Sequence, residues 1–215
     1  PFFNELHPKL SLSYTKGYMR RPFALYFFWI TLSVFFCKDI FKIPQSIGQY
    51  DWDLHSFYYA TTLKSLFDYK QFPFWNPWQC GGNVLWQNPQ IAAVSPVYLL
   101  SMVFSLPVAI KINIVLHYIM SQLGMYLLLT KLFRISHLPL CVFLSSLYTF
   151  SGAHILHIAV GHSTFLPFLY LTFILLFFLS GVSTGNIKNL NYAAMLLTFC
   201  IYSGGIHVFI HTTIA

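Results

Sequence analysis

Long apolar stretches separated by short polar segments are the main pattern along this chain. No formal charge occurs between Ile135 and Ile187. A helix that crosses the hydrocarbon core of a bilayer needs about 20 apolar residues, so this stretch alone has room for two crossings. Over the whole chain the apolar pattern predicts spanning helices at 22–41, 108–130, 138–159, 164–181 and 190–212.

Segment 91–107 decides how these helices are oriented. It is uncharged but short for a span, and prolines interrupt it. If it does not cross, the basic tail 1–21, the loop with Lys131 and Arg134 and the loop with Lys188 share one side. The positive-inside rule favours this arrangement. We therefore expect a cytoplasmic tail and an external loop at 42–107 with interfacial or re-entrant segments.

This orientation also determines which side chains meet. The third predicted helix runs outward, so it delivers His154, His157 and His162 to the same face as Asp51 and Asp53. If 91–107 crosses instead, the histidines and the aspartates lie on opposite sides of the membrane. A composite site of histidine and carboxylate therefore depends on 91–107 remaining outside.

The expected external loop contains two different patterns. From Leu54 to Tyr69, apolar residues recur at helical spacing opposite a polar face that includes Thr61 and Thr62. This pattern predicts a helix lying along the membrane surface. In segment 72–82, two prolines and paired glycines disfavour regular structure.

Composition supports a membrane protein and excludes a soluble one. Hydrophobic residues make up 57% of the 215 residues, and charged residues only 8%, against roughly 25% in soluble domains. The net charge of +7 is spread among apolar segments, so it indicates topology and not nucleic-acid binding. The fold class expected is all-α, a polytopic transmembrane helical bundle. Because the chain starts without Met and ends in an apolar run, we expect a fragment of a longer protein.

Carboxylates are confined to one region. Apart from Glu5, every acidic residue lies between Asp39 and Asp68. In a chain this apolar, a carboxylate is expected only where water, a cation or chemistry stabilises it. Asp51 and Asp53, which flank Trp52, are therefore the candidate catalytic residues.

The backbone conformation decides whether the side chains of Asp51 and Asp53 can act together. In an extended segment, residues i and i+2 face the same way, so the pair would bind one divalent cation, the only cofactor suggested. On a helix the two side chains point roughly 160° apart and cannot share an ion. Alternatively, Asp53 caps the following helix and Asp51 is solvated, although Ser56 stands where a capping box needs Glu or Gln.

Side chains suited to sugar binding surround these aspartates. Aromatic rings beside amide groups form a favourable surface for sugars, although Trp and Tyr also mark the membrane boundary with no further role. Histidine pairs at helical spacing can bind zinc, but no carboxylate accompanies them, so a hydrogen-bonding role is favoured. The candidate substrate-binding residues are His55, Trp75, Asn76, Gln90, His154 and His162.

Several motifs in fixed order resemble one family. They are Asp51-Trp52-Asp53, Phe72-Pro73-Phe74-Trp75-Asn76-Pro77-Trp78, Cys80-Gly81-Gly82, Asn88-Pro89-Gln90, Ser95-Pro96, Gly124-Met125-Tyr126-Leu127-Leu128, Phe150-Ser151-Gly152, and Gly161-His162 before Leu166-Pro167. Over roughly 45–170, this order resembles bacterial YfhO-like multispanning proteins of the GT-C glycosyltransferase superfamily. The resemblance implies a polyprenyl-phosphate-linked sugar donor, inversion at the sugar carbon, and an acidic residue of the first external loop acting at the acceptor. That role falls on Asp51 or Asp53.

The function expected is therefore transfer of a lipid-linked sugar to an envelope acceptor. The resemblance places the chain in a bacterial inner membrane, with the active face non-cytoplasmic, and makes the donor and membrane lipids its partners. Two alternatives remain: a transporter or lipid flippase, and a non-catalytic envelope-assembly protein. A transporter would use charges in the middle of the membrane. Here the charges cluster in the expected external loop instead, and Lys111 is the one charge near the interior of a predicted span.

Overall fold

The structure, a computed structural model, describes residues 22–48, 50–86 and 88–214, so the predicted tail 1–21 lies outside the described residues. The described chain is mostly helical, with a single two-residue hairpin as its sheet structure, and this confirms the all-α prediction. Its longer helices are α1 (Pro22–Cys37), α2 (Trp52–Leu63), α4 (Leu106–Leu127), α5 (Leu138–Thr149), α6 (Gly152–Ala159), α7 (Leu171–Thr184), α8 (Ile187–Tyr202) and α9 (Ile206–Ile214). The shorter elements are η1 (Lys38–Phe41), η2 (Lys64–Asp68), β1 (Trp75–Asn76), β2 (Asn83–Val84), α3 (Pro96–Leu100), η3 (Leu128–Leu132) and η4 (Ser163–Tyr170).

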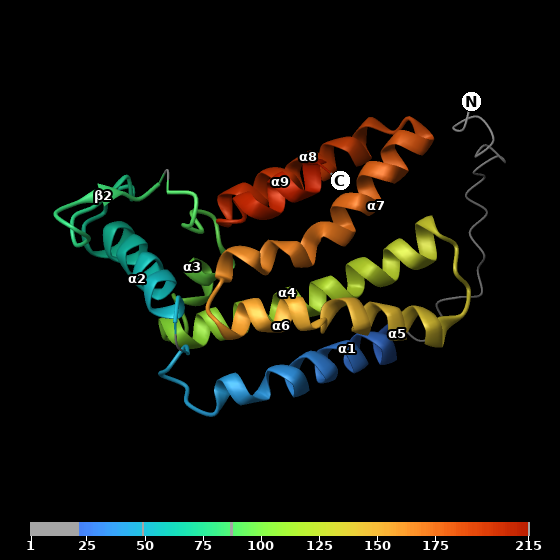
Figure 1. Cartoon of the computed structure of the whole chain (residues 1–215), viewed down its shortest axis with the longest axis horizontal. Coiled ribbons are helices and arrows are strands. Elements are labelled where there is room, and N and C mark those ends of the chain that lie inside the picture. Colours follow the sequence, from blue (N-terminus) through green and yellow to red (C-terminus); the bar gives the residue numbers. More distant parts are fainter. Residues whose placement is uncertain (1–21, 49, 87, 215) are drawn as a thin grey trace.

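The long helices run side by side along the long axis of the molecule (Figure 1). Segment 42–105, with α2, the two strands and α3, lies at one end, where the turns at 160–162 and 203–205 also lie. We call this the loop end. The opposite end carries the connections 133–137 and 185–186 (Figure 1). Segment 91–107 contains only the short helix α3 and the start of α4, and it stays at the loop end.

Four helical stretches of the described chain are long and apolar enough to cross a membrane. They are Phe23–Phe41, Leu106–Leu132, Leu138–Ala159 and Ser163–Thr184. Each lies within a few residues of a span predicted from the sequence. The part of the chain that the structure describes is therefore all-α, with four candidate membrane-spanning helices.

The prediction of one continuous helix at 190–212 is wrong, because α8 and α9 are separated at 203–205. Gly204 has a φ of +81°, and a Cβ there would lie 3.2 Å from the Gln90 carbonyl oxygen. The Val94 amide donates to the Tyr202 carbonyl oxygen at 2.9 Å. The break therefore allows segment 90–94 to dock closely against the end of α8.

Helix α4 is the centre of the bundle. It packs against α1, α2, α3, α5 and α7. Polar side chains join it to its neighbours. His117 meets the Tyr170 hydroxyl at 2.8 Å, and Gln122 donates to Ser33 Oγ at 2.7 Å. Such bonds between helices are the usual means of satisfying polar groups inside a bilayer.

Helix α2 does not have the surface orientation that its sequence pattern predicts. Thr61 and Thr62, expected on a polar outer face, are buried at 3% and 2% exposure. Phe67, expected on the apolar face, is 44% exposed. The reason is that α2 lies against α3 and α4, with Tyr59 and Tyr98 in edge contact at 5.7 Å. The helix faces a protein surface, so its buried side need not be its most apolar side.

Segment 72–82 is largely irregular, as expected, but it includes one strand of a short hairpin. Trp75 pairs with Val84, and Asn76 with Asn83, in an antiparallel two-stranded sheet. The Gly82 amide donates to the Gln79 carbonyl oxygen at 2.8 Å and closes the turn. The hairpin gives the aromatic segment a fixed path at the loop end.

The two ends of the bundle should be reached from different sides of the membrane. Asp53 and Ser183 are both exposed. Asp53 lies at the start of α2, at the loop end, and Ser183 lies at the last turn of α7, next to the connection 185–186 at the opposite end. In a chain without native cysteines, a membrane-impermeant maleimide should label Asp53→Cys in intact cells but not Ser183→Cys, because the basic loops favour the cytoplasm. Permeabilised cells should show both labelled. The reverse pattern in intact cells would overturn the predicted orientation.

Candidate functional site

The start of α2 is docked onto the turn at 160–162, more than a hundred residues later in the chain. The Asp51 amide donates to the Val160 carbonyl oxygen at 3.2 Å. The indole Nε1 of Trp52 donates to the Ile158 carbonyl oxygen at 2.8 Å. Trp52 itself is only 2% exposed. These contacts fix the first turn of α2 against the end of α6.

Gly161 makes this docking possible. Its φ is +93°, in the left-handed region that side chains disfavour. A Cβ at this position would collide with the backbone nitrogen of Trp52 and lie 2.8 Å from the Asp51 carbonyl carbon. The two backbones approach so closely that only glycine fits. The adjacent His162 is thereby held next to Asp51.

Asp51 and two histidines form a connected chain of polar groups. His162 Nε2 lies 3.2 Å from Asp51 Oδ2, and His162 Nδ1 lies 2.9 Å from His157 Nδ1. If neutral His162 donates through Nε2 to the carboxylate, its Nδ1 must accept, so His157 donates through Nδ1. The Nε2 of His157 is then left as a base. The ring of His157 is held by stacking on Phe165, with centroids 3.8 Å apart.

The Asp51–His162 pair is too exposed to be mainly a stabilising contact. The side chains are 54% and 38% exposed, and ion pairs in such positions contribute about 0–1 kcal/mol. Solvent and small molecules can therefore reach the carboxylate. The pair combines an accessible anion with a proton-carrying ring, which is the arrangement needed to accept and pass on a proton.

His55 lies behind this pair, one turn after Asp51 on α2. It is only 5% exposed, and it hydrogen-bonds to the backbone of Gln90. Burial lowers the pKa of His55, and His162 lowers it further, while Asp51 and the Gln90 backbone act in the opposite direction. His55 is thus a buried group that links α2 to segment 90–94, whereas the sequence placed it in substrate binding.

Asp53 does not share a face with Asp51. Asp53 lies in the first turn of α2, and Asp51 is the N-cap residue just before it, with helical backbone geometry (φ −70°, ψ −7°). The extended conformation that would let the two bind one cation is therefore not formed. Among the described residues, no group of three or more His, Cys, Asp and Glu side chains is arranged to hold a metal ion. Asp53 is exposed, and its negative charge in the first turn of α2 interacts favourably with the positive end of the helix dipole.

Two loop residues predicted to bind substrate have structural contacts. Asn76 is fully buried, and its Oδ1 accepts from the Trp78 amide at 3.0 Å. Trp75 covers Gly82, where a Cβ would lie 2.7 Å from the indole Cε2, yet Trp75 remains 53% exposed. Of these two, only Trp75 still presents a surface to a ligand. Gln90 is exposed, its backbone N–H donates to Asn88 Oδ1 at 3.0 Å, and its backbone also hydrogen-bonds to His55.

His154 lies one turn of α6 away from the Asp51 chain. Its Nδ1 is 3.3 Å from the Thr149 carbonyl oxygen, and its ring meets Tyr148 edge-on at 5.2 Å. The ring that extends the Asp51–His162 pair is His157, which the sequence brought to the same face but did not select. The spacing of His157 and His162 around Gly161 was the available signal.

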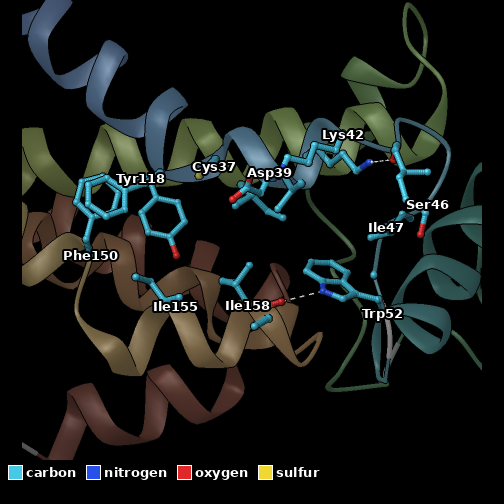
Figure 2. A pocket seen from close by; sticks show the side chains of 17 residues that line it. Cys37, Asp39, Lys42, Ser46, Ile47, Trp52, Tyr118, Phe150, Ile155 and Ile158 are labelled. Carbon is cyan, nitrogen blue, oxygen red and sulfur yellow. Dashed lines mark hydrogen bonds and ion pairs between the residues drawn. The ribbon is translucent and has the colours of Figure 1, made fainter.

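A cavity of about 480 Å³ lies on the other side of Trp52 (Figure 2). The end of α1, the connection 42–48, α4 and α6 enclose it. Trp52 and Ile158 form part of its wall, whereas Asp51, His157 and His162 do not line it. The loop end therefore contains two adjacent features, the Asp51–His162–His157 chain and a largely apolar cavity with Trp52 between them. Comparison with protein-family models, curated proteins and solved structures finds no match for this chain.

Replacing Gly161 should damage the docking of α2 more than an ordinary left-handed glycine replacement would. Gly161→Ala and Gly185→Ala both force alanine into a positive φ, but Gly185 has no atom within 4 Å of a new Cβ. We expect Gly161→Ala to lower the free energy of unfolding by about 1–3 kcal/mol more than Gly185→Ala. Denaturant unfolding in detergent measures the difference. Equal losses would show that the close approach at Gly161 is absent.

The low pKa of His55 should make the fold sensitive to acid. The unfolded chain binds a proton at His55 near pH 6.5 and the folded chain only at lower pH, so stability falls as the pH drops below about 6.5. His55→Gln should flatten this fall, and Asp51→Asn should steepen it by removing the carboxylate that favours protonation. Thermal midpoints at pH 7 and pH 5 test this. The same acid loss in His55→Gln as in the parent chain would contradict it.

Proposed function

We propose that this protein transfers a sugar from a polyprenyl-phosphate-linked donor to an acceptor on the non-cytoplasmic face of a bacterial inner membrane. The observation that carries the proposal is the Asp51–His162 pair, 3.2 Å apart at the loop end of the bundle. A half-exposed carboxylate beside a histidine, at the end of an apolar bundle, suits a base that acts where a lipid-linked donor presents its headgroup.

The chemistry required of the protein is limited, because the donor already carries a phosphate leaving group. The acceptor hydroxyl oxygen attacks the sugar carbon, its proton passes to Asp51, and the polyprenyl phosphate departs with the electron pair. A positioned base of this kind contributes about 10²–10⁴-fold in rate. His162 orients the carboxylate, and His157 holds His162 through the bond between their Nδ1 atoms.

Asp51 is the better base of the two aspartates that flank Trp52. Its carboxylate meets His162, whereas Asp53 is exposed on the first turn of α2, with no ion pair among the described residues. Asp53 is better placed to stabilise the start of the helix than to share a proton. The proposal therefore assigns the base to Asp51 and a supporting role to Asp53.

The family resemblance supports the same site. Asp51-Trp52-Asp53 and Gly161-His162 were both among the motifs that suggested GT-C glycosyltransferases, and they contact each other here. The exposed face of Trp75, in another of those motifs, lies in the same loop-end segment. It offers a flat aromatic surface for a sugar ring.

A transporter is the second candidate, because the helices are interrupted. The α5–α6 pair is broken at Phe150 and Ser151, and the α8–α9 pair at 203–205, and discontinuous helices are common around transporter substrate sites. A transporter would need its polar site near the middle of the membrane. The Asp51–His162 pair lies at the loop end instead, which favours the transferase.

Removing the carboxylate of Asp51 should abolish transfer without unfolding the protein. In full-length protein supplied with a labelled polyprenyl-phosphate sugar, Asp51→Asn should lower the rate by about 10²–10⁴-fold. His162→Gln should cause a smaller loss, and Asp53→Asn a smaller loss still. Asp68→Asn, an exposed aspartate of η2, is the matched control and should keep the parent rate. Full activity in Asp51→Asn would remove the proposed base.

A further inference from the structure

We propose that the cavity between α1, α4 and α6 binds one anionic phospholipid of the surrounding membrane, with its phosphate at Lys111 and an acyl chain along α1. This goes beyond the proposed transfer reaction, because the ligand is a resident lipid and not the sugar donor. The proposal rests on the charge, shape and opening of the cavity.

Lys111 gives the cavity an excess of positive charge. It is only 1% exposed, and its Nζ donates to the carbonyl oxygens of Ile43 and Pro44 at 2.6 and 3.1 Å. Among the described residues, no carboxylate lies within ion-pair distance of it. An ammonium has three protons to donate, so one donor and the whole charge remain unmatched. A buried cation in this state favours an anionic partner.

The other two charges of the cavity cancel. Lys42 and Asp39 both line it and form an ion pair at 2.8 Å. The net lining charge is therefore the single positive charge of Lys111, which matches one phosphodiester. A zwitterionic lipid would bring an additional cation to a site that already has one in excess.

The cavity is polar at one end and apolar at the other. Ser46 and Trp52 lie at the end next to the connection 42–48, while Tyr118 and Phe150 lie at the far end (Figure 2). The rings of Tyr118 and Phe150 stack at 5.4 Å, and Phe36 stacks on Phe150 at 4.2 Å. This polarity matches a lipid whose headgroup is at the loop end and whose chain runs toward the middle of the bundle.

The cavity opens sideways, where lipid chains surround the helices. Phe36 and Ile155 line it, yet they remain 51% and 39% exposed. In a spanning bundle these surfaces face hydrocarbon and not water. The volume of about 480 Å³ lies within the usual range of small-ligand sites, roughly 300–1,000 Å³. The cavity can therefore hold the phosphate and part of one acyl chain of a single lipid.

A resident lipid fits this cavity better than the sugar donor does. Trp52 stands between the cavity and Asp51, and its indole is fixed by the Ile158 carbonyl oxygen. A phosphate at Lys111 would not present its substituent to the Asp51–His162 pair. A lipid bound there would instead support the wall formed by Trp52 and Ile158, which positions the start of α2.

The test measures lipid binding and does not require sugar transfer. Full-length protein in detergent micelles receives phosphatidylglycerol or phosphatidylcholine, and native mass spectrometry counts bound lipids. We expect one phosphatidylglycerol bound in preference to phosphatidylcholine, and a loss of about tenfold or more in Lys111→Met, as for a lost charged hydrogen bond. Lys111→Arg should retain binding. Lys188→Met, which removes an exposed lysine at the other end of the bundle, is the matched control and should change nothing.

A second variant separates loss of the site from loss of the fold. Ile155→Trp fills the half-exposed side of the cavity and leaves Lys111 in place. It should exclude the acyl chain and so lower the amount of phosphatidylglycerol bound. Equal binding of the two lipids would overturn the proposal. So would unchanged binding of phosphatidylglycerol in both Lys111→Met and Ile155→Trp. Displacement of phosphatidylglycerol by an equal concentration of polyprenyl phosphate would also overturn it and assign the cavity to the donor.

Discussion

The structure of the loop end depends on glycine at position 161, which has no side chain. Because no Cβ projects from this residue, the backbone of the 160–162 turn approaches the backbone of Asp51 and Trp52 to contact distance. Three consequences follow from this one approach. The first turn of α2 is fixed by the hydrogen bond from Asp51 to Val160, the Trp52 indole reaches Ile158, and His162 meets the Asp51 carboxylate. Local backbone geometry thus assembles the pair to which we assign the chemistry.

The second constraint is the need to satisfy polar groups inside an apolar bundle. Most buried polar side chains of α4 do so through other helices, as His117 does with Tyr170 and Gln122 with Ser33. Lys111 differs, since its partners are two backbone carbonyl oxygens and its charge is not matched. The need of buried polar groups for partners therefore explains the hydrogen bonds that join the helices. For Lys111, which lacks an opposite charge, the same need favours an anion in the cavity.

Hydropathy located the four candidate spanning helices well because length and apolar composition are what make a helix able to cross a bilayer. It failed at 190–212, where the break depends on Gly204 packing against segment 90–94, a contact between distant parts of the chain. The amphipathic pattern of 54–69 predicted a helix but the wrong buried face, because α3 and α4 cover Thr61 and Thr62. Spacing alone does not reveal which neighbour a helix has.

The candidate site was predictable in part. The confinement of the aspartates to one region of an apolar chain pointed to Asp51 and Asp53 together, and the expected topology brought the histidines to the same face. The structure selects His157 and His162 over His154 because the turn at Gly161 sets which ring points to Asp51. The predicted cation site shared by Asp51 and Asp53 is not formed, because these residues begin a helix. Lys111 was visible as an unusual charge, but its cavity was not.

The most direct measurement of the docked arrangement is a disulfide between α2 and the 160–162 turn. Residues 51 and 160 are joined by a backbone hydrogen bond, so their Cα atoms should fall within disulfide range, about 4.4–6.8 Å. In a chain without native cysteines, mild oxidation of Asp51→Cys with Val160→Cys should form a rapid crosslink, while Asp53→Cys with Val160→Cys should not. Absence of the first crosslink, or equal formation of both, would contradict the docking of α2 on which the Asp51–His162 pair depends.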